Sequence, residues 1–193
     1  MNKEKIKIIT DVLTTLGSFS EHDIQLFCNE LSLKNVIKDE VLLNNGDISN
    51  TLLFILSGAI ELLKFNEDGE RNTIDLFIEK DWVLNSYSFI SQKPSDSLLI
   101  ACENCEVFEI TLPSIHRLIT ASPAFFQFFK LFENLNHRLH FFDEAMSPDE
   151  KYLYLLNHRP VLIQKFPQKV IASYLKITPE TLSRVRARFS KIS

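Results

Sequence analysis

The sequence has little of what marks several protein classes. It holds only four glycines and seven prolines in 193 residues, which excludes collagen-like, linker-rich and low-complexity chains. Its densest apolar stretch, residues 52–56, is far shorter than the ~20 residues that span a bilayer. Charged residues interrupt the first ten residues, so the chain does not begin with the basic start and apolar run of a secretion signal. We therefore expect no secretion signal, no membrane contact and a cytoplasmic location.

Cysteine is also scarce, with Cys28, Cys102 and Cys105 as the three examples. Three thiols in one chain cannot form a four-thiolate zinc or iron–sulfur site. The C-x-x-C pair falls in a strand-like stretch, where positions three apart point to opposite faces. These features predict buried free thiols, no metal site and no cofactor.

The charges are unevenly distributed along the chain, whose net charge is −4. Residues 1–148 hold 12 Lys and Arg against 22 Asp and Glu, whereas residues 149–193 hold 9 against 3. The two parts thus carry net charges of −10 and +6. An acidic body with a basic end is typical of a protein of which one part meets phosphates, although a solvated basic face gives the same balance.

The first two thirds of the chain predict a β structure with flanking helices. Residues 2–16 and 20–31 have helical spacing of apolar residues, with Ser20 as an N-cap. Short β-type runs follow, separated by Asn-, Asp- and Gly-containing turns at 44–47 and 66–69. The expected strands are 36–43, 51–56, 59–65, 72–78, 98–101 and 106–110. The fold class is therefore α+β, with an N-terminal jelly-roll barrel (a double-stranded β-helix).

A long helix is predicted from Ser122 and Pro123 to residue 147. Its apolar residues recur at alternating spacings of four and three, which is the pattern of a helix-pairing seam. One alternative is a helix that only covers its own sheet, but further phenylalanines lie off the seam. We expect a parallel homodimer through Phe128, Phe132, Leu135, Leu139, Phe142 and Met146.

The last 45 residues predict compact helices, of which 168–174 and 179–191 resemble a helix-turn-helix. The apolar positions that lock two such helices together are Ile171, Leu175, Ile177, Leu182 and Val185, and Ala172 stands where the helices nearly touch. Lys176 occupies the turn position that usually holds a left-handed glycine, which should cost about 1 kcal/mol.

The second helix of this pair exposes polar groups that suit DNA. Arginine grips guanine through two hydrogen bonds and glutamate accepts from the cytosine amine, whereas phosphate contacts position the protein. The predicted DNA-binding residues are Lys169, Thr178, Glu180, Thr181, Ser183, Arg184 and Arg188.

A barrel, a long helix and a terminal helix-turn-helix, in this order, resemble the cyclic-AMP receptor and fumarate–nitrate regulator (Crp/Fnr) family of bacterial transcription factors. The resemblance rests on residues 46–47 with 53–60 in the barrel and on 171–175 with 178–184 near the end. Residues 180–184 are similar to the Glu-x-x-Ser-Arg reading motif of the fumarate–nitrate branch, and residues 174–180 resemble the Tyr-Leu-x-Ile-Thr-Pro-Glu form common in Bacteroidetes members. The resemblance implies double-stranded palindromic DNA, a second copy of the chain, RNA polymerase and a small-molecule effector as partners.

The sequence departs from the family at its cyclic-nucleotide cassette. An ungapped alignment puts Leu84 and Asn85 at the family's Gly-Glu, and Ser95 and Asp96 at its Arg-Ser. The cation for the cyclic phosphate is therefore missing, and cyclic AMP is not the expected effector. The candidate effector pocket comprises Leu84, Asn85, Ser86, Ser95, Asp96 and His140.

Three other functions are weighed against this one. A haem sensor would need an axial histidine from the barrel, for which His140 is the candidate, although a packed interface histidine fits the same position. A ligand-sensing barrel could instead dock a protein through its helical end. A cupin-like oxygenase lacks a His-x-His or a two-His-one-carboxylate set on its strands, so we expect no enzyme. The expected domains are 1–121 (sensor), 122–147 (dimerisation helix) and 148–193 (DNA-binding).

Overall fold

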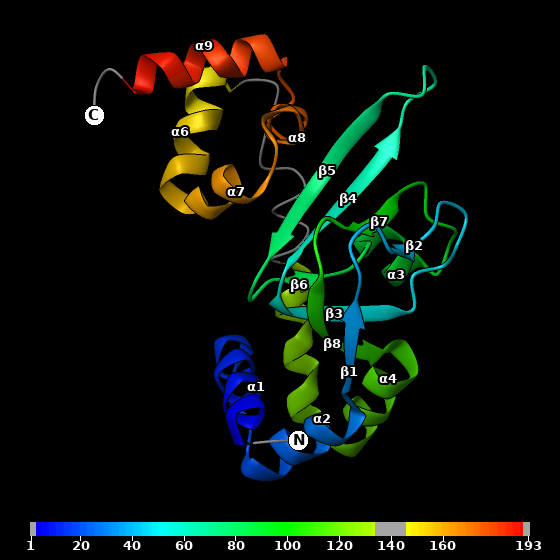
Figure 1. Ribbon diagram of the computed structural model, residues 1–193. Helices are drawn as coiled ribbons and strands as arrows, with labels where there is room; N and C mark the ends of the chain where they lie inside the picture. The colour runs from blue at the N-terminus through cyan, green and yellow to red at the C-terminus, as the bar shows by residue number, and fades with distance from the viewer. Residues whose placement is uncertain (1–2, 134–145, 191–193) are drawn as a thin grey trace.

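The computed structural model describes residues 3–133 and 146–190 (Figure 1). The helices are α1 (Lys3–Leu16), α2 (Glu21–Glu30), α3 (Ser86–Ser91), α4 (Leu112–Ala121), the 3-10 helix η1 (Pro123–Phe128), α6 (Pro148–His158), α7 (Pro160–Lys165), α8 (Gln168–Tyr174) and α9 (Pro179–Phe189). The strands are β1 (Ser32–Val36), β2 (Val41–Leu43), β3 (Thr51–Ser57), β4 (Ala59–Phe65), β5 (Arg71–Ile78), β6 (Trp82–Val83), β7 (Leu98–Ala101) and β8 (Cys105–Thr111).

Two antiparallel sheets form the body of the molecule, in the orders β1-β8-β3-β6 and β2-β7-β4-β5. The long hairpin β4–β5 pairs Ala59 with Ile78 at its base and Phe65 with Arg71 near its tip. The α+β class is confirmed. The single strand expected over 36–43 is wrong, because Asp39 adopts a left-handed φ of 66° and turns the chain between β1 and β2.

The main core lies between the two sheets and under the N-terminal helices. The turn from β3 to β4 approaches β8 so closely that a Cβ on Gly58 would lie 2.5 Å from Cys105 Sγ. Gly58 also has a φ of 107°, so glycine is required here on both grounds. The second core joins the C-terminal helices to the outer face of hairpin β4–β5, through Ala59 and Leu76.

Helix starts follow local capping signals. Ser20 and Asp23 form a capping box: Ser20 Oγ accepts from the Asp23 backbone N–H at 3.2 Å, and Asp23 Oδ2 accepts from the Ser20 backbone N–H at 2.8 Å. Ser122 caps the next predicted helix start. Helices α3 and α7 and the two-residue strand β6 are additions to the predicted elements, because such short segments leave little periodicity to detect.

The helix predicted to begin at Pro123 starts as the 3-10 helix η1 instead. A 3-10 helix aligns side chains three apart, which points both Phe125 and Phe128 into the core against Phe27. Phe126 and Phe129 are aligned in the same way on the outside, where their rings stack at 6.3 Å and are 54% and 63% exposed. The expectation that Phe128 faces a partner helix is therefore wrong.

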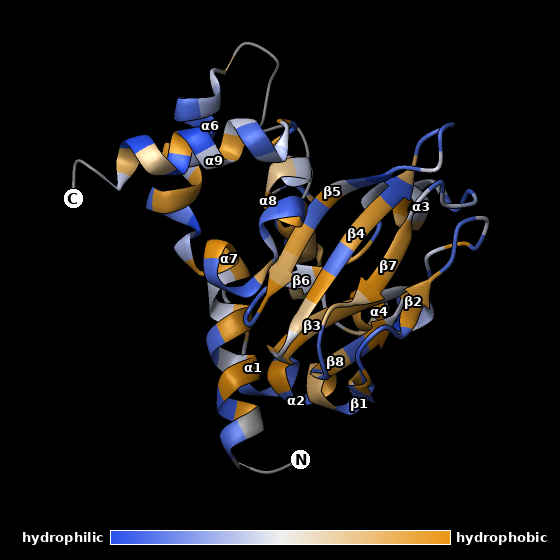
Figure 2. Cartoon of the chain, turned by 45° about the horizontal axis from the view of Figure 1, so that its top comes forward, coloured by the Kyte–Doolittle hydropathy of each residue, from blue (hydrophilic) through white to orange (hydrophobic). Residues whose placement is uncertain are grey.

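The C-terminal helices sit beside hairpin β4–β5, at the opposite end of the molecule from α1 and α2 (Figures 1 and 2). Over the residues that the structure describes, no helix combines the length and apolarity needed to cross a bilayer.

Candidate nucleic-acid interface and effector pocket

Helices α8 and α9 are joined by a tight turn whose conformation the sequence predicted. Lys176 has a φ of 55°, the left-handed region in which glycine is preferred. The backbone N–H of Ile177 donates to Ala172 O at 3.0 Å and closes the turn. Thr178 then caps α9, because its Oγ1 accepts from the Thr181 backbone N–H at 3.2 Å.

The predicted core positions hold the two helices together. Leu175 and Val185 are fully buried, and Ile177 is half-buried. Ala172 is also fully buried, as a position of close helix approach requires. These contacts fix α9 relative to α8 through apolar packing that needs no ligand.

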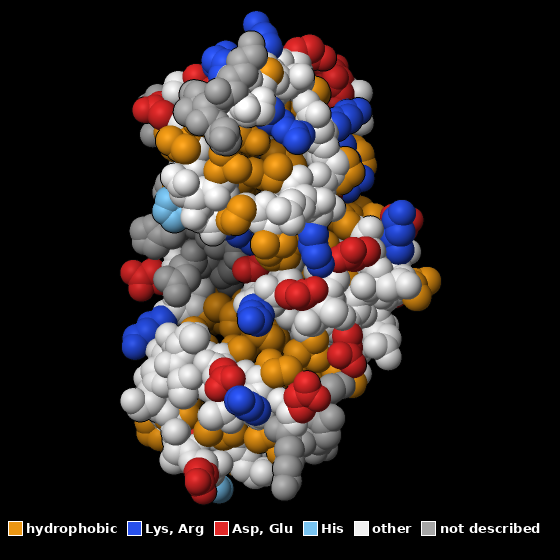
Figure 3. Space-filling view, turned by 60° about the vertical axis from the view of Figure 1, so that its left-hand side comes forward, with side chains coloured by type: hydrophobic (Ala, Val, Ile, Leu, Met, Phe, Trp, Pro, Cys, Tyr) orange, Lys and Arg blue, Asp and Glu red, His pale blue; other side chains and the backbone are white. Residues whose placement is uncertain are grey.

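The face of α9 that points away from this core is polar and open to solvent. Glu180, Ser183 and Arg184 are exposed together on it, and Arg184 Nη2 donates to Thr181 Oγ1 at 3.2 Å. Lys169 is exposed at the start of α8. Lys and Arg side chains gather over this end of the molecule in the space-filling view (Figure 3).

Four of the predicted DNA-contacting residues already have side-chain partners, namely Thr178, Thr181, Arg184 and Arg188. Arg188 forms an ion pair with Asp149 of α6. Thr181 is half-buried and its hydroxyl accepts from Arg184. A phosphate contact by Arg188 would have to compete with Asp149, whereas Lys169 has no ion pair among the described residues.

The structure brings together the two halves of the candidate effector pocket. Asn85 Nδ2 donates to Ser95 Oγ at 2.8 Å, and both side chains are buried. Asn85 Oδ1 caps α3 by accepting from the Ser88 backbone N–H at 3.0 Å. Ser95 Oγ donates to Ser97 O at 2.7 Å. The polar groups of this region thus satisfy one another.

The remaining pocket residues do not supply the missing cation. Leu84 is part of the main core, and Ser86 is buried at the start of α3. The side chain of Asp96 is 74% exposed and lies 3.9 Å from Lys64. His140 lies outside the described residues.

Half of the six predicted seam residues also lie outside the described part of the chain. Leu135, Leu139 and Phe142 lie outside the described residues. Phe132 is half-buried and packs on Phe89, with ring centroids 5.7 Å apart, and Met146 is half-buried.

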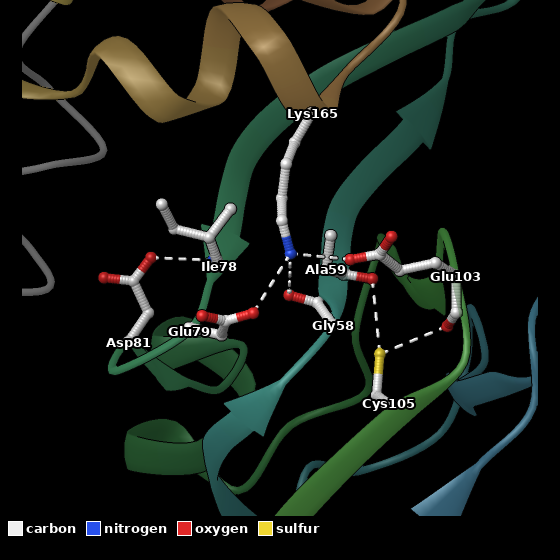
Figure 4. Close-up of polar contacts among 8 residues, drawn as sticks. All are labelled: Gly58, Ala59, Ile78, Glu79, Asp81, Glu103, Cys105 and Lys165. Atoms are coloured by element: carbon white, nitrogen blue, oxygen red, sulfur yellow. Dashed lines mark hydrogen bonds and ion pairs between the residues drawn. The ribbon is translucent and has the colours of Figure 1, made fainter.

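Sequence reasoning missed the polar contacts that hold the C-terminal helices to the sheets. At the end of α7, Lys165 Nζ donates to Glu103 Oε1 at 2.7 Å, to Glu79 Oε1 at 3.4 Å and to Gly58 O at 3.3 Å (Figure 4). Burial lowers the pKa of Lys165, but the two carboxylates outweigh it and the net shift is upward. The sequence offered no pattern that would reveal these contacts, because Lys165 is a single lysine far in sequence from its partners.

A second cation, Arg159 between α6 and α7, also joins the C-terminal helices to the sheet. Arg159 donates to Leu76 O at 3.0 Å, pairs with Asp81 and lies 3.9 Å from Asp75. Its side chain is only 17% exposed, so solvent screens these contacts weakly.

Beneath α8, strand β4 carries a fully buried carboxylate, Glu61. It accepts from Thr73 Oγ1 at 2.8 Å and pairs through both oxygens with Arg71. The pair fixes the guanidinium of Arg71 on the hairpin.

All three cysteines are free thiols as predicted, but only Cys105 is fully buried, whereas Cys28 and Cys102 are half-buried. Burial, followed by the nearby charge of Glu61, raises the pKa of Cys102 to about 12. Burial also raises the pKa of Cys105, whose Sγ lies 3.5 Å from Ala59 O. Cys102 lies in the turn between β7 and β8 rather than in a strand. The described residues contain no group of His, Cys, Asp and Glu that could hold a metal ion.

Comparison with known proteins defines the fold. Residues 33–122 match the family model of the cyclic nucleotide-binding domain. FixK2 from Bradyrhizobium japonicum aligns with a TM-score of 0.69 and 16% identity, over 83% of this chain and 85% of that one. A putative transcriptional regulator of the Crp/Fnr family from Eubacterium rectale aligns with a TM-score of 0.61 and 15% identity, over 89% and 84%.

The catabolite activator protein of Thermus thermophilus is a third neighbour, with a TM-score of 0.53 and 18% identity over 90% and 85%. No curated protein matches the sequence. The chain thus contains a cyclic nucleotide-binding domain and shares its fold with regulators of the Crp/Fnr type.

Proposed function

We propose that this protein is a sequence-specific DNA-binding transcription regulator of the Crp/Fnr type. The observation that carries the proposal is the α8–α9 pair: a capped second helix, a left-handed turn at Lys176 and an exposed face with Glu180, Ser183 and Arg184. A helix-turn-helix places the second helix in the major groove, with the N-terminal residues of that helix at the base edges.

In this proposal residues 1–121 form the sensor domain for a small-molecule effector, residues 122–147 form the dimerisation helix and residues 148–193 bind DNA. Glu180, Ser183 and Arg184 read bases, while Lys169, Thr178, Thr181 and Arg188 help to position the phosphate backbone. The regulator works as a cytoplasmic homodimer on a palindromic operator, and RNA polymerase is its further partner.

The dimer interface of this proposal is the seam of the helix predicted from the sequence after η1, with Leu135, Leu139 and Phe142 as its central residues. The exposed pair Phe126 and Phe129 supports a partner-facing surface at the start of that helix, because large apolar side chains at a surface favour burial in an interface.

The effector pocket of this regulator is degenerate. Asn85 and Ser95 form a neutral pair where a cyclic phosphate would need a cation, so neither cyclic AMP nor cyclic GMP is the signal. Another small molecule could serve as the effector only by displacing this hydrogen-bonded network.

In vitro selection of random duplexes by the purified full-length protein tests the proposal. We expect enrichment of a palindrome whose half-sites lie about one helical turn apart, with a central G·C pair in each half. By family resemblance the half-site should be similar to the TTG-containing sites of the fumarate–nitrate branch. Failure to enrich any sequence would contradict the proposal and favour a helical end that docks a protein.

A further inference from the structure

A groove separates the outer part of hairpin β4–β5 from helices α8 and α9. Its volume is about 780 Å³. Gly69 and Glu70 line it from the hairpin, and Lys169, Thr178 and Pro179 line it from the helices. The hairpin therefore faces the N-terminal end of α9, which is the end that a recognition helix presents to bases.

A DNA duplex cannot enter this groove in the conformation of the structure. A volume of about 780 Å³ suits a small molecule and is far below what a duplex needs. The backbone N–H of Thr73 donates to Ser173 Oγ at 2.9 Å, which joins β5 to α8 beside the groove. Movement of the hairpin tip away from α8 would open the groove, so that phosphates could also reach Lys169 and Thr178 from that side.

The base and the outer part of the hairpin are held differently. At the base, Ala59 and Leu76 belong to the second core, and Arg159 donates a hydrogen bond to Leu76 O. Near the tip, Thr73 meets α8 through the hydrogen bond to Ser173, and Phe65 is 56% exposed. Outward movement of the tip would thus leave the packing at the base intact.

The tip of the hairpin is acidic. Glu67, Asp68 and Glu70 fall within four consecutive residues, all exposed. The turn is ordered by Asn66, whose Oδ1 accepts from the Glu70 backbone N–H at 2.7 Å and whose Nδ2 donates to Glu70 Oε2 at 3.1 Å. The hydropathy colouring shows this polar tip at the end of a largely apolar hairpin (Figure 2).

The cations on the hairpin do not cancel this charge at the groove. Arg71 is paired with the buried Glu61, and Lys64 lies 3.9 Å from Asp96. Lys169 faces the tip from α8. A DNA phosphate arriving at Lys169 would meet carboxylates across the groove, and like charges repel most strongly at low salt.

We propose that the acidic tip of hairpin β4–β5, formed by Glu67, Asp68 and Glu70, is a built-in brake on DNA binding. In the closed conformation it stands beside the DNA-reading end of α9 and repels the phosphate backbone. The brake acts on every duplex because it opposes phosphates, not bases. This inference rests on the proposed function.

The test compares three full-length proteins: the natural chain, a tip variant and a control variant. The tip variant carries Glu67→Gln, Asp68→Asn and Glu70→Gln. The control variant carries Glu4→Gln, Asp11→Asn and Glu21→Gln, which remove the same charge from exposed positions on α1 and α2 at the far end of the molecule. Equal melting temperatures of the three proteins would establish that folding is unchanged.

Binding is measured by fluorescence anisotropy on the selected operator and on a random duplex, at several salt concentrations. We expect the tip variant to bind both duplexes about tenfold more tightly than the control at low salt, the effect of three carboxylate–phosphate repulsions across roughly 10 Å of water. The advantage should shrink as salt rises. Equal affinities of the tip and control variants would show that the acidic tip does not oppose DNA binding, while the proposed DNA-binding function would remain supported. If none of the three proteins binds any duplex, the proposed function fails as well.

Hydrogen exchange gives a second readout of the same inference. The Thr73 amide is protected by its bond to Ser173 Oγ. Saturation of the natural protein with the operator should speed exchange at Thr73 severalfold as the hairpin leaves α8. If exchange at the Thr73 amide is unchanged with the operator bound, the hairpin tip does not leave α8 and the inferred movement is wrong.

Discussion

Asn85 and Ser95 stand ten residues apart in sequence and share a hydrogen bond of 2.8 Å inside the sensor fold. The sequence alignment predicts that they stand where the resembled family holds a ribose-binding glutamate and a phosphate-binding arginine. A neutral pair offers no charge to offset the burial of a cyclic phosphate.

The first prediction concerns cyclic nucleotides. Calorimetry with cyclic AMP or cyclic GMP at about 1 mM should show no saturable heat, because burying a phosphate without a cation is costly. A micromolar dissociation constant would contradict the assignment of the pocket. The double variant Asn85→Glu with Ser95→Arg introduces the charged pair that the resembled family uses, but it removes the cap of α3 and should cost about 1 kcal/mol of stability.

The second prediction separates base reading from phosphate contact. Arg184→Ala should cost about 1–3 kcal/mol on the selected operator and much less on random DNA. Lys169→Ala should weaken both about equally and lower the salt slope by roughly one counterion. Arg186→Ala is the matched control, an exposed α9 arginine with no predicted base contact. If Arg184→Ala leaves the ratio of specific to non-specific binding unchanged, α9 does not read bases through this residue.

The third prediction tests the strained turn. Lys176 has a φ of 55°, so Lys176→Gly should raise the free energy of unfolding by about 1 kcal/mol without altering the preferred DNA sequence. Ala187→Gly, in the last turn of α9, should lower it by up to about 1 kcal/mol. Thermal unfolding measures both. A loss of stability in Lys176→Gly would show that the lysine side chain contributes more than the turn costs.

The fourth prediction concerns the contact between the C-terminal helices and the sheets. Arg159→Gln leaves Asp75 and Asp81 without their cation in a poorly exposed site, and should destabilise the protein by about 2 kcal/mol. Arg117→Gln breaks a pair with Glu30 in which the arginine side chain is 61% exposed, and should cost less than about 1 kcal/mol. Equal losses in urea unfolding would contradict a structural role for Arg159.

The fifth prediction addresses the homodimer. Light scattering should give about 45 kDa, twice the chain mass of 22.4 kDa. Leu135→Asp with Leu139→Asp should give a monomer that no longer binds the operator, because two carboxylates cannot be buried in an apolar seam. Phe129→Ser should weaken the dimer as well. A natural protein that is monomeric at micromolar concentration would rule out the proposed interface.

Local signals in the sequence predicted the parts of the fold that local interactions determine. Ser20 and Ser122 cap helices as expected, and Lys176 takes the left-handed conformation that its place in the turn pattern requires. The side of the helix occupied by Phe128 was not predictable from spacing, because the seam assumed an α-helix where the chain forms a 3-10 turn.

Contacts between distant segments were likewise beyond the sequence pattern. Nothing near Arg159 or Lys165 shows that their partners lie 60 to 110 residues earlier, on strand β5 and on turns between strands. Asn85 and Ser95 share a hydrogen bond, but their alignment with the two ends of the family cassette stays a prediction. The DNA-binding roles of Glu180, Ser183 and Arg184 stay predictions.

Ala59 and Leu76 of the sheet complete the core of the C-terminal helices, and this sharing has a consequence for how the protein can evolve and be engineered. A fragment containing only residues 148–190 would present an apolar surface that the sheet normally covers. Grafting these helices onto another sensor domain would therefore require the outer face of β4–β5 to be carried along. Substitutions at Leu76 should affect the packing of the C-terminal helices as directly as substitutions within those helices. The sheet face and the helices are therefore expected to change together in evolution rather than to be exchanged as separate modules.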